Sequence, residues 1–137
     1  CTRAQSVTFL WNAAGKPEPS SLTVPFTDVS ADAYYYKALC WAVERKITNG
    51  TSGTTFPPNG IVTRAQAVTM MWRAAGSPEV AADQTFTDVP ANAYYAAAVR
   101  WAAANKITTG TGNNCFSPAA PCIRAQIVTL LYNQLHA

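Results

Sequence analysis

Charge is scarce in this 137-residue chain: 12% of the residues are Asp, Glu, Lys or Arg, and 49% are hydrophobic. The net charge of +3 is too small for the dense Lys and Arg surface of a nucleic-acid-binding protein. The single histidine, His136, stands next to the C-terminus, where chain ends fray, which argues against hydrolase mechanisms with a buried histidine base. No apolar run approaches the roughly 18 residues that span a bilayer, and no signal peptide stands at the start. We therefore expect a piece of a soluble protein, about one domain in size.

The sequence repeats itself with a period of about 60 residues. A shift of 60 positions places Phe26-Thr27-Asp28-Val29 on Phe86-Thr87-Asp88-Val89, and Arg64-Ala65-Gln66 on Arg124-Ala125-Gln126. A shift of 61 positions places Thr2-Arg3-Ala4-Gln5 on Thr63-Arg64-Ala65-Gln66. The chain therefore holds the C-terminal part of one repeat, over 1–19, and two further repeats, over 20–80 and 81–137.

Each full repeat has the pattern of a helix, a loop and a second helix. Apolar residues at three- and four-residue spacing predict a helix over Ala33 to Lys46, and the Gly-, Ser-, Thr- and Pro-rich stretch from Thr48 to Gly60 predicts a loop. The second helix opens with Thr-Arg-Ala-Gln, in which Thr at the N-cap and Gln three residues later form a capping box. In the third copy Ile123 replaces Thr, so we expect its helix to start most weakly.

These landmarks together resemble the S-layer homology (SLH) repeat. They are the Phe-Thr-Asp-Val segment, a Tyr-rich helix start, Trp-Ala, Lys-Ile-Thr before a glycine, and the Thr-Arg-Ala-Gln tetrapeptide, where the family has Thr-Arg-Ala-Glu. The resemblance implies an all-α fold in which tandem SLH repeats form one compact domain with a pseudo-threefold, trefoil-like arrangement, here with a truncated first repeat. It also implies grooves between neighbouring repeats that bind a secondary cell-wall polymer, often one that ends in a pyruvylated amino sugar.

The arginine of each tetrapeptide is the main candidate for a ligand contact. The first position of each of these helices holds an arginine: Arg3, Arg64 and Arg124. The helix macrodipole disfavours a cation there, so the presence of arginine in all three copies indicates that it has a role. An arginine fork beside free helix amides is a receptor for a carboxylate. The alternative is structural: each arginine pairs with Asp28 or Asp88 and joins adjacent repeats.

Other recurrent residues have both a binding and a structural interpretation. Gln5, Gln66 and Gln126 could touch sugar hydroxyls, although capping explains a glutamine at this spacing. Asp28 and Asp88 could bind sugar or serve as caps and ion pairs. Trp41 and Trp101 could stack on a sugar ring or pack in the core. The loop entrances offer polar contacts and glycines that permit a close approach, at Asn49, Gly50, Thr109 and Gly110.

The four cysteines favour disulfides over a metal site. Cys115 and Cys122 stand where the previous repeat has Thr55 and Val62, so both cysteines are specific to the third repeat and are candidates for a pair. A disulfide between them would contribute roughly 2.5 kcal/mol to stability and would anchor the start of the third Arg-Ala-Gln helix. Cys1 and Cys40 are a second possible pair, unless the partner of Cys1 lies upstream. We expect no metal and no cofactor, because the spacings do not match metal sites.

We therefore expect a non-catalytic cell-wall anchoring module that binds an anionic, pyruvylated polysaccharide at the surface of a Gram-positive-type bacterium. Expected partners include neither nucleic acid nor a membrane. The alternative function is protein interaction or self-assembly, with a homo-oligomer formed through the truncated first repeat. A glycoside hydrolase is disfavoured, because Asp28 and Asp88 occupy equivalent places in different repeats rather than flanking one cleft.

Overall fold

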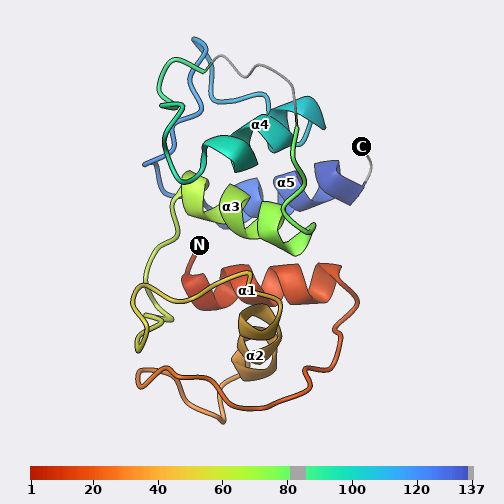
Figure 1. The fold of residues 1–137 in the computed structure, drawn as a ribbon, viewed down its shortest axis with the longest axis vertical. Coiled ribbons are helices and arrows are strands. Elements are labelled where there is room, and N and C mark those ends of the chain that lie inside the picture. The colour runs from red at the N-terminus through yellow and green to blue at the C-terminus, as the bar shows by residue number, and fades with distance from the viewer. Residues whose placement is uncertain (81–85, 136–137) are drawn as a thin grey trace. The chain divides into compact units, whose positions relative to one another are not determined.

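The protein was analysed as a computed structural model that describes residues 1–80 and 86–135. Within these ranges the fold is all-α, with five helices and isolated β-bridges in place of strands. The expectation of an all-α tandem-repeat fold is therefore confirmed. The chain divides into two compact units, Cys1–Val62 and Thr63–Ala137. Figure 1 colours the chain continuously by residue number, from red at the N-terminus to blue at the C-terminus.

The first unit is built on α1 (Arg3–Ala13) and α2 (Tyr36–Glu44), which pack against each other. Ala38, Leu39 and Ala42 of α2 are fully buried, and the small side chains of the two alanines let helices pack closely. The loop after α2 then returns to the start of α1, where Val62 N–H donates to the Cys1 carbonyl over 2.9 Å. The unit thus closes by pairing its first and last residues.

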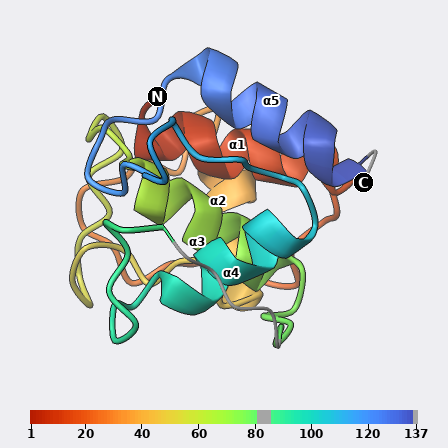
Figure 2. The ribbon, with the colours of Figure 1, turned by 90° about the horizontal axis from the view of Figure 1, so that it is seen from above.

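The second unit repeats this plan with α3 (Arg64–Ala74), α4 (Ala96–Ala104) and α5 (Arg124–Leu135). α3 packs against α4, and the two helices lie side by side in both ribbon views (Figures 1 and 2). The loop after α4 returns to the start of α3, where Arg64 N–H donates to the Ala120 carbonyl over 2.9 Å. α5 follows that loop.

Both units therefore combine the end of one sequence repeat with the beginning of the next. α1 belongs to the first repeat and α2 to the second, while α3 closes the second and α4 opens the third. The repeat limits at 19/20 and 80/81 stay a prediction. Residues 81–85, which adjoin the second limit, lie outside the described part of the chain, as does His136.

The predicted capping boxes are confirmed in α1 and α3. Thr2 accepts from the Gln5 N–H over 3.1 Å while Gln5 Oε1 accepts from the Thr2 N–H, and Thr63 and Gln66 repeat this exchange. At α5 one of the two hydrogen bonds of a capping box is present: Gln126 Oε1 accepts from the Ile123 N–H. The second bond is not formed, because an isoleucine side chain has no oxygen that could accept from the Gln126 N–H.

The predicted helix from Ala33 to Lys46 was too long at both ends, since α2 spans Tyr36–Glu44. At its start, Ala33 and Tyr36 donate to carbonyls three residues back, which makes turns instead of a helix. At its end, Lys46 adopts a left-handed conformation with φ of 60°. The predicted loop from Thr48 to Gly60 contains no helix.

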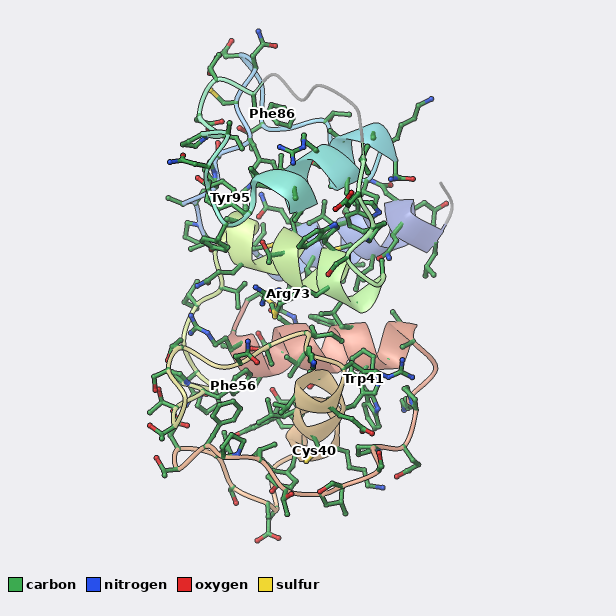
Figure 3. All side chains as sticks on the ribbon, in the orientation of Figure 1. Cys40, Trp41, Phe56, Arg73, Phe86 and Tyr95 are labelled. Carbon is green, nitrogen blue, oxygen red and sulfur yellow. The ribbon has the colours of Figure 1, made fainter. Side chains whose placement is uncertain are left out.

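Each loop is anchored by a pair of phenylalanines. The rings of Phe26 and Phe56 lie 5.6 Å apart between centroids, and those of Phe86 and Phe116 lie 5.8 Å apart. Phe56 and Phe116 are fully buried, and Figure 3 labels Phe56 and Phe86 in the loop regions beside the helices. The Phe-Thr-Asp-Val segment and the loop are therefore joined by apolar packing.

Candidate functional site

An open pocket in the second unit brings together three of the predicted site residues, Arg64, Thr109 and Gly110. Its volume is about 330 Å³. The walls come from the start of α3, the loop after α4 and one face of α5; the remaining lining residues are Ile107, Thr108, Thr111, Ala125, Gln126, Thr129, Leu130 and Asn133. A cation and several uncharged polar groups thus face the same space.

Arg64 is a buried residue of this wall, with 5% of its surface exposed. Its Nε donates to the Phe116 carbonyl over 2.8 Å, and its guanidinium carbon lies 4.8 Å from the centre of the Phe116 ring. Burial lowers the pKa of Arg64, while the nearby Cys122 and Asp88 act in the opposite direction. A guanidinium remains protonated in any protein, so the pocket wall carries a positive charge.

Asp88 also holds the loop that contains Phe116, through hydrogen bonds to its backbone. Its two carboxylate oxygens accept from the backbone N–H groups of Phe116 and Ser117, each over 2.8 Å. Burial raises the pKa of Asp88, but these two donors and the charge of Arg64 outweigh it, so the pKa lies below its ordinary value. Asp28 accepts from the Phe56 N–H in the same way, over 2.8 Å.

Arg64 and Asp88 are therefore linked through Phe116, whose carbonyl accepts from one side chain and whose N–H donates to the other. The sequence had suggested a direct ion pair between them or a ligand role for each. In the structure the aspartate holds the loop, and the arginine both holds the loop and lines the pocket.

Gly110 lines the pocket and has φ of 87°, a left-handed conformation that favours glycine. Its N–H donates to Thr108 Oγ1 over 3.1 Å, and an added Cβ would lie 2.5 Å from the Cys115 carbonyl oxygen. Gly50 has φ of 76° and the same bond to Thr48. The adjoining Thr109 and Asn49 are exposed.

The three arginines of the repeated tetrapeptide have different surroundings. Arg3 is half-buried, and its Nη1 lies so close to Gly60 that a Cβ there would collide with it. Arg124 is exposed at the start of α5. Among the three, Arg64 is the one that lines the pocket of the second unit.

Trp41 and Trp101 lie in the core, with 5% and 6% of their surface exposed, so their surroundings favour packing over sugar stacking. Figure 3 shows Trp41 on α2. Gln5 and Gln66 serve as caps, as described above. A ligand role for these four residues stays a prediction.

The cysteines occupy both units. Cys115 is a thiol with Sγ 3.6 Å from the Asn113 carbonyl oxygen, and Cys122 is fully buried. Cys40 is a buried thiol whose pKa is raised, chiefly by burial, and Cys1 Sγ lies 3.4 Å from Ser6 Oγ. The bridges between Cys115 and Cys122 and between Cys1 and Cys40 stay predictions.

Apart from Gln126, which the sequence offered as a possible sugar contact, the α5 wall of the pocket was missed by the sequence interpretation. Gln126, Thr129, Leu130 and Asn133 recur at three- and four-residue spacing, which places them on one helix face. This spacing was visible in the sequence, but the burial of other α5 positions was needed to show which face meets the loop. Asn133 is held there by its Nδ2, which donates to the Ile107 carbonyl over 3.0 Å.

Over 1–80 and 86–135 no helix is long and apolar enough to cross a membrane. In the same ranges no three acidic, histidine or cysteine side chains gather in a way that could hold a metal ion.

Fold and site together define a helical tandem-repeat module with a polar, cationic pocket. The sequence model of the S-layer homology domain matches this chain twice, over residues 25–68 and 85–128. The chain therefore belongs to the S-layer homology family, as its motifs indicated. Domains of this family are non-catalytic modules that anchor surface proteins to the cell wall, and they indicate a location at the cell surface or cell wall.

Three curated proteins illustrate the family. The chain is 32% identical over 118 residues to a cell surface protein of Thermoanaerobacter kivui and 31% identical over 118 residues to an endoglucanase of Bacillus sp. (strain KSM-635). It is 39% identical over 70 residues to the surface-layer 125 kDa protein of Lysinibacillus sphaericus. These matches cover 82%, 86% and 51% of this chain, but 16%, 12% and 6% of the three relatives.

Proposed function

We propose that this chain binds an anionic cell-wall polysaccharide, and that the pocket of the second unit receives a carboxylate of that polymer, such as a pyruvyl ketal. The observation that carries the proposal is the meeting of Arg64 with the Thr108–Thr111 loop and the polar face of α5 around one open pocket. Binding of this polymer would anchor a larger surface protein to the wall.

The charge and geometry of Arg64 support a carboxylate ligand. Because Nε already donates to Phe116, the guanidinium is fixed in orientation before a ligand arrives. Its two Nη groups carry four further N–H donors, whose planar arrangement matches the two oxygens of a carboxylate. The low exposure of the residue strengthens such a bond, since few water molecules compete for it.

The remaining wall suits a sugar. Gln126 uses Oε1 for the Ile123 N–H and keeps its amide donors, while Asn133 uses Nδ2 for Ile107 and keeps its carbonyl acceptor. Thr109 is exposed at the rim. The proposal does not require Trp41 or Trp101, since both side chains lie in the core.

Thr109→Glu tests the proposal without disturbing the packing, because Thr109 is exposed. A carboxylate at the rim should repel the ligand and lower the affinity for purified pyruvylated wall polymer at least severalfold in calorimetric titration. Ala104→Glu is the matched control: it makes the same charge change at an exposed position of α4 outside the pocket wall, and it should leave the affinity nearly unchanged.

The same titration with polymer stripped of its pyruvate groups tests the ligand chemistry. Arg64 has no anionic partner on the stripped polymer, so binding should weaken strongly. Equal affinity for the two polymers would contradict a carboxylate as the group that Arg64 binds. Equal losses of affinity in Thr109→Glu and Ala104→Glu would contradict this pocket as the binding site.

A further inference from the structure

The segment that follows α1 is attached to α2 through side chains. We call residues 18–22 the strap. Three side chains of α2 bind it, in the pairs Lys37 with Glu18, Glu44 with Ser20, and Tyr36 with Leu22. The Glu44 carboxylate accepts from the Ser20 N–H over 3.0 Å and also from its hydroxyl, and the Tyr36 hydroxyl donates to the Leu22 carbonyl over 3.0 Å. Within the described part of the chain, no backbone group of the strap bonds to another backbone group.

The side chains that bind the strap are specific to α2. The helix at the same place in the next repeat is α4, and 60 positions later it has alanine in place of all three: Ala96, Ala97 and Ala104. An alanine side chain has no polar atom that could hold a strap. These contacts therefore belong to one repeat of this chain and are not part of the pattern that the repeats share.

The strap lies over a buried thiol. Cys40 is two residues, about half a helical turn, from the fully buried Ala38 and Ala42, so it lies on the opposite side of α2. Figure 3 shows Cys40 on the side of α2 away from α1. Tyr36 and Glu44 stand four residues before and after Cys40 on this side, and both bind the strap. Because Cys40 is nevertheless only 2% exposed, we conclude that the strap covers it.

We propose that the strap opens locally: residues 18–22 leave α2 and expose the thiol of Cys40 while α1 and α2 stay packed. The contacts that would break lie at the surface, since Glu18 and Lys37 have 73% and 51% of their side chains exposed. Separating α1 from α2 would instead expose apolar side chains such as Leu39, which is 0% exposed. The strap should therefore open at a lower free energy than the whole unit.

Opening of the strap would change the chemistry of Cys40. Burial raises the pKa of this thiol, so in the closed state it is protonated and unreactive. In the open state its thiolate would exchange with a low-molecular-weight disulfide: a bond forms to one sulfur, and the other leaves as a thiolate. The added group does not fit a site that is 2% exposed, so the strap would stay open until the mixed disulfide is reduced. The proposal concerns the first unit and is independent of the pocket in the second.

Alkylation of the reduced full chain measures the opening. Iodoacetamide bonds to an exposed thiolate with loss of iodide, and mass spectrometry of peptides gives the rate at Cys40 alone. The rate is measured in a series of urea concentrations below the unfolding midpoint. Opening of the strap exposes little surface, so the logarithm of the rate should rise with urea much less steeply than the equilibrium constant of unfolding. Equal slopes would overturn the proposal, because they would show that Cys40 reacts only from the unfolded chain.

Three variants identify the strap as the element that opens. Glu44→Ala removes two hydrogen bonds to a charged group and should accelerate alkylation of Cys40 at least about tenfold. Lys37→Ala removes an exposed ion pair and should accelerate it about threefold. Arg45→Ala is the matched control, since Arg45 is the exposed neighbour of Glu44 outside the set that binds the strap, and it should change the rate less than about twofold.

Glu44→Ala and Lys37→Ala remove charges of opposite sign. An effect of charge on the thiolate would move the two rates in opposite directions, whereas loosening of the strap accelerates both. Opposite shifts in these two variants would therefore overturn the proposal. Equal acceleration in all three variants would also overturn it, by showing that the strap contacts have no special part in shielding Cys40.

Discussion

At the scale of single residues, one side chain can stabilise the fold and offer a ligand contact at once. Arg64 donates to a loop carbonyl, stacks on Phe116 and lines the pocket, so replacing it would change folding and binding together. For this reason the binding test uses Thr109, which is exposed at the rim. The ligand role of Arg64 stays a proposal, and its structural role is a bond to the Phe116 carbonyl in place of the direct ion pair with Asp88 that the sequence had offered as the alternative.

Asp88 makes stability depend on pH. Its folded pKa is lowered, so its contribution is fully present above the unfolded value of about 3.9 and is lost as the pH falls through the folded pKa. Asp88→Asn should lower the free energy of unfolding by about 1.5–3 kcal/mol at pH 7, because two backbone N–H groups lose a charged acceptor. Urea unfolding at a series of pH values measures this loss.

The difference between wild type and Asp88→Asn should shrink below about pH 4. Asp32→Asn is the control, because Asp32 is an exposed acidic residue, and it should alter stability by less than about 0.5 kcal/mol. A difference that stays constant down to pH 2 would show that the charge of Asp88 is not what holds the loop.

At the scale of helices, the N-cap distinguishes three segments that otherwise share a tetrapeptide. Thr2 and Thr63 complete capping boxes, whereas Ile123 leaves the start of α5 with half of one. The isoleucine is 54% exposed, so it contributes little packing that would compensate. The weak start was predictable, because capping depends on which side chain stands at one position.

Ile123→Thr should complete the third capping box and stabilise the protein by about 1 kcal/mol. The Ile123 carbonyl already accepts from Ile127 and its N–H already donates to Gln126, as an N-cap requires. Thermal unfolding measures the gain, and Ile123→Val, which has no hydroxyl, controls for the loss of the larger side chain. An equal effect of both substitutions would contradict capping as the cause.

At the scale of the whole chain, the two compact units of the structure do not coincide with the sequence repeats. Each compact unit joins the closing helix of one repeat to the opening helix of the next, so a boundary drawn from the repeats separates helices that pack together. The sequence period shows what is duplicated. It does not show which halves share a core, because packing depends on contacts between segments far apart in the chain.

Two truncated chains test this division. Residues 63–137 retain the contact of α3 with α4 and all residues of the pocket, so this fragment should unfold cooperatively and keep its helical circular dichroism. Residues 81–137, cut at the repeat limit, lose α3 and should show little helix, because short isolated helices are marginal in water. Similar helicity in the two fragments would contradict the unit boundaries.

The sequence by itself determined the repeat, the starts of the helices that open with Arg-Ala-Gln, and the family, because these depend on local spacing and on residues that cap a helix wherever it lies. It also selected Arg64, Thr109 and Gly110, which line one pocket. Only the tertiary structure decided their surroundings. The same Arg-Ala-Gln segment is half-buried at Arg3, buried at Arg64 and exposed at Arg124, since burial depends on the segment that packs against it, which no local pattern encodes.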